Sequence, residues 1–476
     1  MPISGIAHSF MTKRIYILLA LLFSLLHAAP STAAPGAIPA TKPGAMPTAL
    51  GGRVATATKP GAMPTALGRH VAPAKTPGVP DKTPGAMPPA LGGYAVPATA
   101  ADIKFPEPTP AMKSFSRICY ALLFISPIWQ FTLLWLILST RLSSKMRDRA
   151  EALSKRSFLT LFWYLVLYTA VAVICKLPLN LYAGYWLEHH YGLSHQPFAG
   201  WAGDYGKSIL VDFAIRLPVF WVIYQLMTRW PKRWEFRFWL VLVPLIAIGI
   251  FAQPLIVEPL FNKFTPLPPS PLHDRIHALA VKAGIPNAPI LVADMSKQTD
   301  ETNAYVDGIG SSARIVMWDT TLKKMPDDQI VAVIGHEMGH YVLKHVYWGF
   351  LGAVVALFFL LPIIRRLYDA LIKRNGARWG IDGPNDIAGI PALLFVYIAV
   401  SFLCNPIVNA TAREIEHEAD VYGLQVTGNR IAMAQAFVAL SKDNLSEPSP
   451  PPFIQFWFYN HPTLQERVDY ALGKGK

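Results

Sequence analysis

The residues with the clearest chemical potential are two histidines that flank a glutamate in His336-Glu-Met-Gly-His340. Pro326 and the two aspartates that follow it predict the start of a helix over this pattern. Side chains four positions apart share a helix face, so both imidazoles can bind one tetrahedral zinc ion. Glu337 lies beside them and can accept a proton from a water molecule, whose pKa zinc lowers towards ~7. Composition alone produces the pattern in on the order of one chain in a hundred of this length, so two unrelated surface histidines are the alternative.

A third ligand must come from elsewhere, and the acidic stretch 413–420 contains a suitable residue, Glu416. The stretch predicts a helix that ends near Gly428. Glu416 and Asp420 share one face of it, as a metal ligand and a carboxylate that orients the ligands would. The alternative is that Glu416 is an ordinary solvated carboxylate. His417 is a weaker metal candidate, and the residues expected on the solvated sides of the helix are Glu414 and Glu418.

Long apolar segments must carry these motifs. The chain of 476 residues is 52% hydrophobic and only 15% charged, where a soluble domain is about 25% charged. Six apolar segments are long enough to cross a bilayer, or nearly so. Buried helices of a large soluble protein are the alternative, which six such segments in one chain argue against. The segments are Ile118–Ser139, Phe158–Cys175, Ile209–Met227, Phe238–Val257, Val346–Ile364 and Ile387–Val408.

The positive charges predict how these spans are oriented. Residues 141–156, 229–237 and 365–378 contain six, four and five Lys or Arg, whereas the loop 176–208 contains two. Loops rich in Lys and Arg stay in the cytoplasm, so the odd spans run from outside to inside. The metal motif and the C-terminus then face outward. The net charge of +13 therefore indicates membrane topology and no nucleic-acid partner.

The N-terminal quarter has a different composition. Lys13 and Arg14 precede the apolar stretch Ile15–Leu26, which is shorter than the ~20 residues that span a bilayer. We expect a cleaved signal peptide, or else an uncleaved anchor, which would be a seventh span. The sequence Pro-Gly-Ala-Met-Pro-x-Ala-Leu-Gly then occurs three times, in a region too poor in aromatic residues to form a core. It predicts a disordered tether, or alternatively a partner-binding module.

The predicted organisation has four parts. They are residues 1–34 (signal peptide or anchor), 35–110 (tether), 111–257 (four spans) and 258–476 (metallopeptidase domain with two further spans at 346–364 and 387–408). One charged pair lies inside the third span. Asp212 and Arg216 share a helix face, where they either line a wet cavity or form a neutralised pair that helps helices pack.

The combination of motifs resembles a known family. His336-Glu-Met-Gly-His340, followed after two apolar segments by Glu416-x-x-Ala-Asp420, is similar to the integral-membrane CAAX prenyl protease type of zinc metalloendopeptidase. The resemblance covers roughly residues 115 to 476. Further matching pieces are His190–Ser194, Pro259–Leu267, Asn303–Tyr305, Arg314–Val316, His461-Pro462 and Glu466-Arg467.

The resemblance implies a mainly α fold, in which a ring of membrane helices encloses a wet chamber closed by a small α+β zinc domain. Asp212 and Arg216 would line that chamber. One zinc ion per chain would be held by His336, His340 and Glu416, with Glu337 as general base.

Further residues receive roles from the resemblance. His461 would stabilise the oxyanion of the tetrahedral intermediate, and Asp420 and Arg413 would orient the ligands. Asn303 and Ala304 would lie on an edge strand that pairs with the substrate backbone. The local sequence agrees, because residues 303–306 and 314–319 read as strands around the turn 307–310.

These observations predict a zinc-dependent membrane endopeptidase that cuts membrane-associated or exported polypeptides. Its partners are a peptide or protein substrate and the lipid bilayer, and its oligomeric state stays open. The charge pattern places the zinc domain on the periplasmic face of a bacterial inner membrane, whereas eukaryotic relatives act on the cytosolic side. One alternative is a CAAX-type processing protease with a cytoplasmic site, and another is a transporter or channel with a vestigial metal motif.

Overall fold

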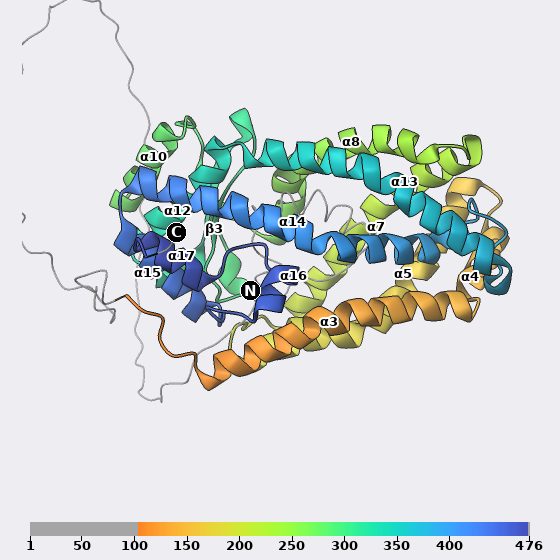
Figure 1. Ribbon diagram of the computed structural model, residues 1–476, viewed down its shortest axis with the longest axis horizontal. Helices are drawn as coiled ribbons and strands as arrows, with labels where there is room; N and C mark the ends of the chain where they lie inside the picture. The colour runs from red at the N-terminus through yellow and green to blue at the C-terminus, as the bar shows by residue number, and fades with distance from the viewer. Residues whose placement is uncertain (1–102, 475–476) are drawn as a thin grey trace, which may run out of the picture. The chain divides into compact units, whose positions relative to one another are not determined.

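The structure, a computed structural model, describes residues 103–474. The predicted signal peptide or anchor and the repeats lie outside the described residues. The predicted fold class, a mainly helical membrane bundle with a small α+β domain, is confirmed (Figure 1). Residues 103–109, the end of the predicted tether, are extended, and Ile103 is buried beside Ala332 and Phe437.

All six predicted spans are helices in the structure, and each is longer than its apolar segment. The helix α14 (Ile390–Thr427), for example, has 38 residues, or about 57 Å at 1.5 Å per residue, against a hydrocarbon core of ~30 Å. It therefore leaves the membrane as one continuous helix that carries Glu416. The other five spans are α3 (Pro110–Ser139), α5 to α6 (Ser157–Leu181 and Leu187–His190, joined by the π-helical turn Tyr182–Trp186), α7 (Phe198–Arg229), α8 to α9 (Trp234–Ala252 and Glu258–Phe261, joined by Gln253–Val257) and α13 (His345–Trp379).

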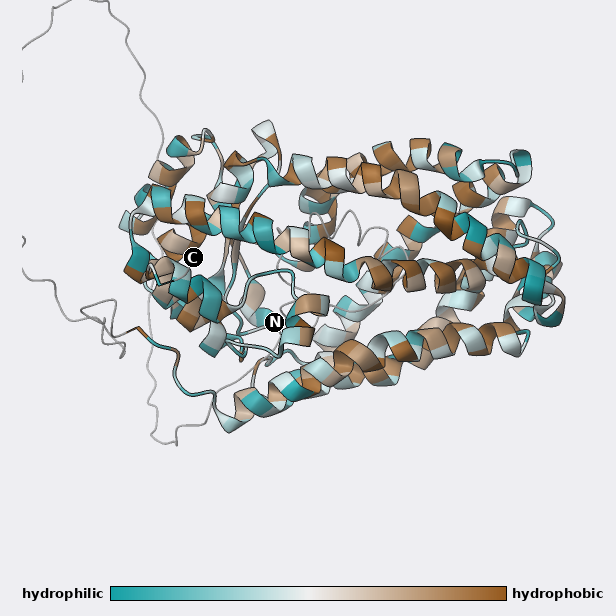
Figure 2. Cartoon of the chain, in the orientation of Figure 1, coloured by the Kyte–Doolittle hydropathy of each residue, from teal (hydrophilic) through white to brown (hydrophobic). Residues whose placement is uncertain are grey.

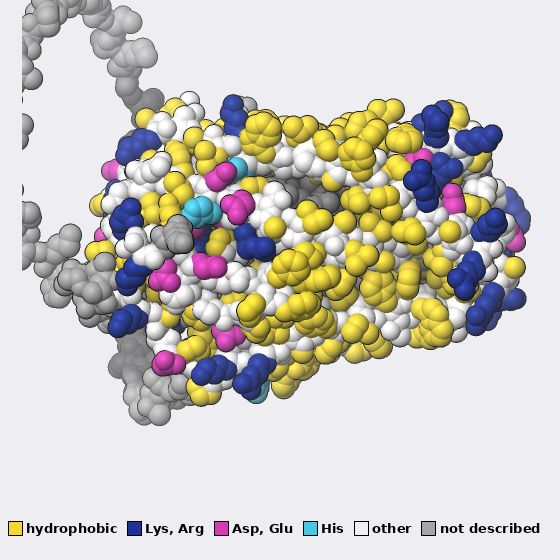
Figure 3. All heavy atoms as spheres, in the orientation of Figure 1, with side chains coloured by type: hydrophobic (Ala, Val, Ile, Leu, Met, Phe, Trp, Pro, Cys, Tyr) yellow, Lys and Arg dark blue, Asp and Glu magenta, His cyan; other side chains and the backbone are white. Residues whose placement is uncertain are grey.

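The outer surface of these helices is apolar where lipid must cover it. Ile174, Leu210 and Ile407 are each exposed over about 70% of their surface (69%, 69% and 72%). Hydrophobic residues dominate the middle of the long helices (Figure 2). On the face in Figure 3 the Lys and Arg side chains lie at both ends of this apolar band, one of which is the end near α4 (Leu142–Leu153) and the last turns of α13. Asp212 and Arg216 form an ion pair of 2.8 Å on the face of α7 that also buries Val219.

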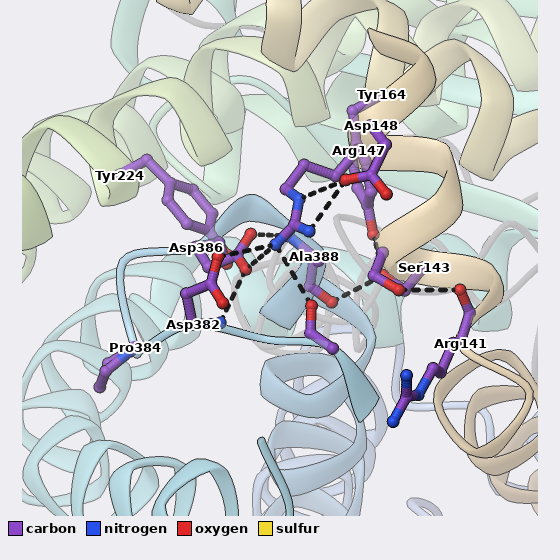
Figure 4. Close-up of polar contacts among 12 residues, drawn as sticks. Arg141, Ser143, Arg147, Asp148, Tyr164, Tyr224, Asp382, Pro384, Asp386 and Ala388 are labelled. Carbon is purple, nitrogen blue, oxygen red and sulfur yellow. Dashed lines mark hydrogen bonds and ion pairs between the residues drawn. The ribbon is translucent and has the colours of Figure 1, made fainter. Parts of the chain in front are cut away.

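A polar network, here called the connector network, joins the helices at this basic end (Figure 4). Arg147 of α4 contacts the carboxylate of Asp386, which precedes α14. The hydroxyl of Ser143 donates to the carbonyl of Ala388 (2.6 Å) and contacts the hydroxyl of Tyr164 (2.7 Å). Tyr224 of α7 donates to the backbone carbonyl of Asp386 (3.1 Å). The helices α4, α5 and α7 are thus tied to the link between α13 and α14.

The second part of the described fold surrounds a four-stranded sheet of order β1-β2-β4-β3, in which only β2 and β4 are parallel. The strands predicted on either side of the turn are present within one residue, and β3 lies at the sheet edge. The strands are β1 (Phe264–Pro266), β2 (Ile290–Ala293), β3 (Ala304–Asp307) and β4 (Arg314–Trp318). The helices around it are α10 (Pro271–Lys282), α11 (Asp319–Lys324), α12 (Asp327–Val342), α15 (Arg430–Asp443), α16 (Pro452–Phe458) and α17 (Leu464–Ala471), with short 3-10 turns at Met295–Lys297, Gly310–Ser312 and Ile387–Gly389.

The helix α12 carries the His-Glu-x-x-His pattern and packs one face on the sheet. Ile330, Ile334 and Met338 recur every four residues and are each at most 1% exposed, in one core with β3 and β4. This burial fixes the rotation of α12 about its axis. The histidines consequently point away from the sheet, towards α14.

Candidate metal centre

Glycines allow α12 and α14 to approach each other closely. A Cβ on Gly339 would lie 3.0 Å from the Cα of Ala419, and one on Gly423 would lie 2.8 Å from the backbone nitrogen of His336. A side chain at either place would force the helices apart. The close contact brings Glu416 to the histidine face of α12, although two membrane spans and their connection separate the two motifs in the sequence.

Three side chains from these two helices form a buried triangle. The Nε2 atoms of His336 and His340 lie 3.2 Å apart. Oxygens of the Glu416 carboxylate lie 3.4 Å from the first nitrogen and 3.5 Å from the second. Ligand atoms about 2.0–2.1 Å from a tetrahedral zinc ion lie about 3.3–3.4 Å from one another, and the three distances here, which involve both oxygens of Glu416, are close to that spacing. The three side chains together could hold one metal ion.

Unsatisfied oxygens support the same conclusion. Among the described residues, the buried Oε2 atom of Glu337 has no hydrogen-bond partner, and that of Glu416 accepts no hydrogen bond although the Nε2 of His461 lies 3.2 Å away. A buried carboxylate oxygen without a donor is costly unless a cation neutralises it. The residues therefore fit a divalent metal ion in both geometry and charge.

An outer set of contacts holds the candidate ligand His336. Its Nδ1 lies 2.7 Å from Asp420, as expected for a carboxylate that accepts from a ligand histidine. Arg467 of α17 binds both oxygens of Asp420, at 2.7 and 2.8 Å. Arg413, which we expected near the carboxylates, instead donates to the backbone carbonyl of Tyr459 (2.7 Å). The sequence placed Arg467 in a matching motif but could not show that it, rather than Arg413, reaches Asp420.

Burial sets the protonation of the remaining groups. It raises the pKa of Glu337 from its ordinary value of 4.5 to about 7, although the charge of His336 opposes the shift. It lowers the pKa of His340 to about 3 and that of His461 to about 4. Burial also acts to lower the pKa of His336, but Asp420 and Glu416 outweigh it and the pKa rises to about 10. Neutral His340 and His461 are therefore available as ligand and hydrogen-bonding group at neutral pH.

A cavity of about 120 Å³ adjoins the triangle. Asn303, Glu337 and His461 all line it, so the structure brings together residues from the start of β3, from α12 and from the C-terminal segment. The Nε2 of His461 lies 3.2 Å from Glu416. Ala304 is on the edge strand as expected, but it is buried and does not line this cavity. Apolar side chains also line the cavity: Met325, Val333, Met433, Phe437 and Leu440.

Two further histidines lie near the triangle or on its helices. His345, the first residue of α13, received no role from the sequence, yet it contacts both His340 and Glu418, which we expected to be solvated. The sequence signal for His345 was its position, five residues after His340, the second histidine of the motif. His417, the weaker metal candidate, packs its ring against Tyr470 (centroids 4.5 Å apart) and is not part of the triangle.

Six membrane-spanning helices joined to this site define the class of protein, an integral membrane metalloendopeptidase. Residues 266–473 match peptidase family M48, and residues 93–263 match the CAAX prenyl protease N-terminal family, described as five membrane helices. The chain belongs to peptidase family M48.

Individual relatives agree with this assignment. The chain is 34% identical to the uncharacterized metalloprotease YhfN of Bacillus subtilis over 366 residues, which are 77% of this chain and 86% of the relative. It is 27% identical to CAAX prenyl protease 1 of Saccharomyces cerevisiae, over 66% of this chain and 73% of that one. The crystal structure of S. mikatae Ste24p shares its fold, with a TM-score of 0.68 at 24% identity over 78% of this chain and 92% of that one.

Proposed function

We propose that this protein is a zinc-dependent endopeptidase that hydrolyses peptide bonds of membrane-associated or exported polypeptides. The observation that carries the proposal is the buried triangle of His336, His340 and Glu416, together with the unsatisfied oxygens that point to a cation. Two imidazoles and one carboxylate are the ligand set of catalytic zinc sites that keep a fourth position open, and the proton that His336 otherwise holds would leave on zinc binding. His336, His340 and Glu416 would hold the ion.

The chemistry follows from the groups beside the triangle. A bound zinc ion would supply Lewis acidity, which activates water and polarises a carbonyl. Glu337 accepts the proton of the attacking water and passes it to the leaving amine, a task suited to a pKa of about 7. His461 lines the same cavity and donates a hydrogen bond to the developing oxyanion. Asp420 keeps His336 in the tautomer that presents Nε2 to the ion.

Substrate binding would use the sheet edge. β3 is an edge strand, and Asn303 lies directly before it on the cavity wall. An extended peptide can add to such an edge through backbone hydrogen bonds, which do not depend on the side chains of the peptide. Asn303 and Ala304 are the residues we propose for this contact.

The experiment that tests the reaction is Glu337→Gln. The variant should keep its zinc and lose proteolysis by about 10²–10⁴-fold, because the amide cannot accept a proton. Glu414→Gln is the matched control, since Glu414 is exposed on the helix that carries Glu416. Cleavage of an unfolded reporter protein by the purified chain in detergent measures the effect. Wild-type cleavage by Glu337→Gln would contradict the mechanism.

We further propose that the zinc domain faces the periplasm of a bacterial inner membrane. The basic loops 141–156 and 365–378 support this orientation, because such loops stay in the cytoplasm. A reporter fused after Lys476 tests it: alkaline phosphatase activity is expected, and cytoplasmic fluorescence would favour a cytoplasmic site instead. A CAAX-type processing protease with a cytoplasmic site is the second candidate, favoured by the names of relatives such as CAAX prenyl protease 1.

A transporter or channel with a vestigial motif is a weaker candidate. The buried triangle argues against it, since a motif that no longer bound metal would not require three potential ligand side chains to stay close together. A zinc-to-protein ratio near zero in the purified wild type would favour this candidate over the protease.

A further inference from the structure

The two ligand histidines are supported on their outer sides by different groups. The outer nitrogen of His336 contacts Asp420, which Arg467 holds in turn. The outer nitrogen of His340, Nδ1, lies 3.0 Å from Nδ1 of His345. His345 is 4% exposed, and its Nε2 lies 3.0 Å from the carboxylate of Glu418. His340, His345 and Glu418 thus form a chain of contacts that runs outward from the triangle.

One arrangement of protons satisfies every contact in this chain. Because Nε2 of His340 faces the triangle, its Nδ1 carries the proton of the neutral ring. That N–H donates to Nδ1 of His345, which must then be an acceptor. The proton of His345 is consequently on Nε2, where it donates to Glu418. No other tautomer of His345 makes both hydrogen bonds.

The backbone brings His345 back to His340 through a strained link. The helix α12 ends at Val342, and α13 begins at His345 after only two residues. Lys344 has φ of +59°, a left-handed conformation that is unfavourable for a residue other than glycine. This turn places the rings of His340 and His345 with centroids 5.1 Å apart and planes inclined at 73°, so that their Nδ1 atoms face each other.

We propose that His345 is a positioning residue for the metal ligand His340, held in place by Glu418. The inference rests on the proposed zinc site. His345 fixes the tautomer and the ring orientation of His340, as Asp420 does for His336. The two supports differ at their outer ends, because Asp420 is buried against Arg467 whereas the side chain of Glu418 is 62% exposed. A histidine that only began α13 would have no effect on the metal.

The decisive comparison is His345→Ala with His345→Asn. Alanine removes the acceptor for His340, whereas the Oδ1 of asparagine can take the place of Nδ1 and accept the same hydrogen bond. Loss of an outer partner of a metal ligand typically weakens metal binding by about 10–100-fold. We expect that loss in His345→Ala and its recovery in His345→Asn. Zinc affinity of the purified full chain in detergent, measured by competition with a chelating indicator, gives the result.

Controls separate positioning from damage to the fold. His417→Ala removes a histidine of α14 that packs on Tyr470 outside the triangle, and should bind zinc as the wild type does. Glu418→Gln keeps an acceptor for His345 and should have a smaller effect than His345→Ala. Thermal unfolding of each zinc-free protein checks that the variants are folded.

The possible failures are distinguishable. Zinc affinity of His345→Ala equal to that of the wild type overturns the inference and leaves the zinc site intact. An equal loss in His345→Ala and His345→Asn also overturns it, because the acceptor is then not what matters. A wild type that binds no zinc contradicts the proposed function itself.

Discussion

Two buried polar clusters lie at opposite ends of α13 and α14 (Figure 1). At one end, His336, His340 and Glu416 converge, and carboxylate oxygens of Glu337 and Glu416 accept no hydrogen bond in the described part of the chain. At the other end lies the connector network (Figure 4), where the carboxylate of Asp386 accepts from Arg147 and from the backbone nitrogens of residues 382 and 388. No buried side-chain atom of the described connector residues is without a partner.

The difference distinguishes a ligand-binding site from a purely structural connection between helices. Buried polar groups that satisfy one another stabilise a connection between elements and need no ligand. Buried groups that converge with unsatisfied oxygens cost stability unless a cation or a proton neutralises them. Loss of a connector residue should therefore reduce stability alone, whereas loss of a metal-centre residue should remove the metal and the activity.

The largest effect is expected from Glu416→Ala. The variant should lose its zinc and all proteolysis, because two histidines alone hold the ion weakly. Metal analysis of the purified protein should give a zinc-to-protein ratio near zero. Glu414→Ala, on the exposed side of the same helix, should retain both. A Glu416→Ala protein that retains its zinc would contradict the metal-binding role of this cluster.

Next in size is the effect of Arg467→Ala. It leaves Asp420 buried without its cation, which costs about 3–5 kcal/mol, and it loosens His336. The temperature of unfolding and the zinc affinity should both fall. Arg413→Ala is the matched control, since Arg413 contacts backbone carbonyls and should leave zinc affinity unchanged. The reverse order of the two arginines would show that the wrong one was assigned to Asp420.

A smaller and purely structural effect is expected from Asp386→Ala in the connector network. Removing the Asp386 carboxylate, which accepts from Arg147, should lower stability by about 1–3 kcal/mol in thermal unfolding. Zinc content should not change. Asp148→Ala removes the exposed partner of the same arginine and should cost at most about 1 kcal/mol. Loss of zinc from Asp386→Ala would contradict the separation of the two clusters.

The last effect, a dependence of stability on pH, is confined to the metal-free protein. Because the pKa of Glu337 is raised to about 7 in the folded chain, its contribution to stability is present at low pH and is lost as the pH rises through 7. Chelated wild type should therefore become less stable than chelated Glu337→Gln between about pH 5 and pH 8. Thermal unfolding of both proteins across this range measures it. Parallel curves would show that burial does not shift the pKa of Glu337.

Prediction from the sequence was strongest within single elements. The lengths of the apolar segments predicted all six spans, because crossing a bilayer requires a minimum run of apolar residues. Gly428 was correctly predicted to end the helix after Glu416, where it takes the left-handed conformation with φ of +67°. The helices extend beyond the apolar segments, since polar turns outside the bilayer continue the same hydrogen-bond pattern.

Contacts between elements were much harder to predict. Glu418 is exposed, as helix periodicity predicts, but its carboxylate also accepts from His345 of another helix, which periodicity could not show. Arg413 stands close to the ligand Glu416 in sequence, but Arg467 reaches Asp420 from α17. Helix periodicity assigns a residue to a side of its own helix and contains no information on which neighbour packs there.

The sequence by itself determined which residues share a face and which segments cross the membrane, because both depend on local repeat and local composition. On any α-helix, His336 and His340 point to the same side, because they are four positions apart. Only the tertiary structure decided that Glu416 completes their triangle, that Arg467 and His345 support it, and that the connector network closes the other end. These depend on the distance between packed helices, which Gly339 and Gly423 reduce until backbone meets backbone.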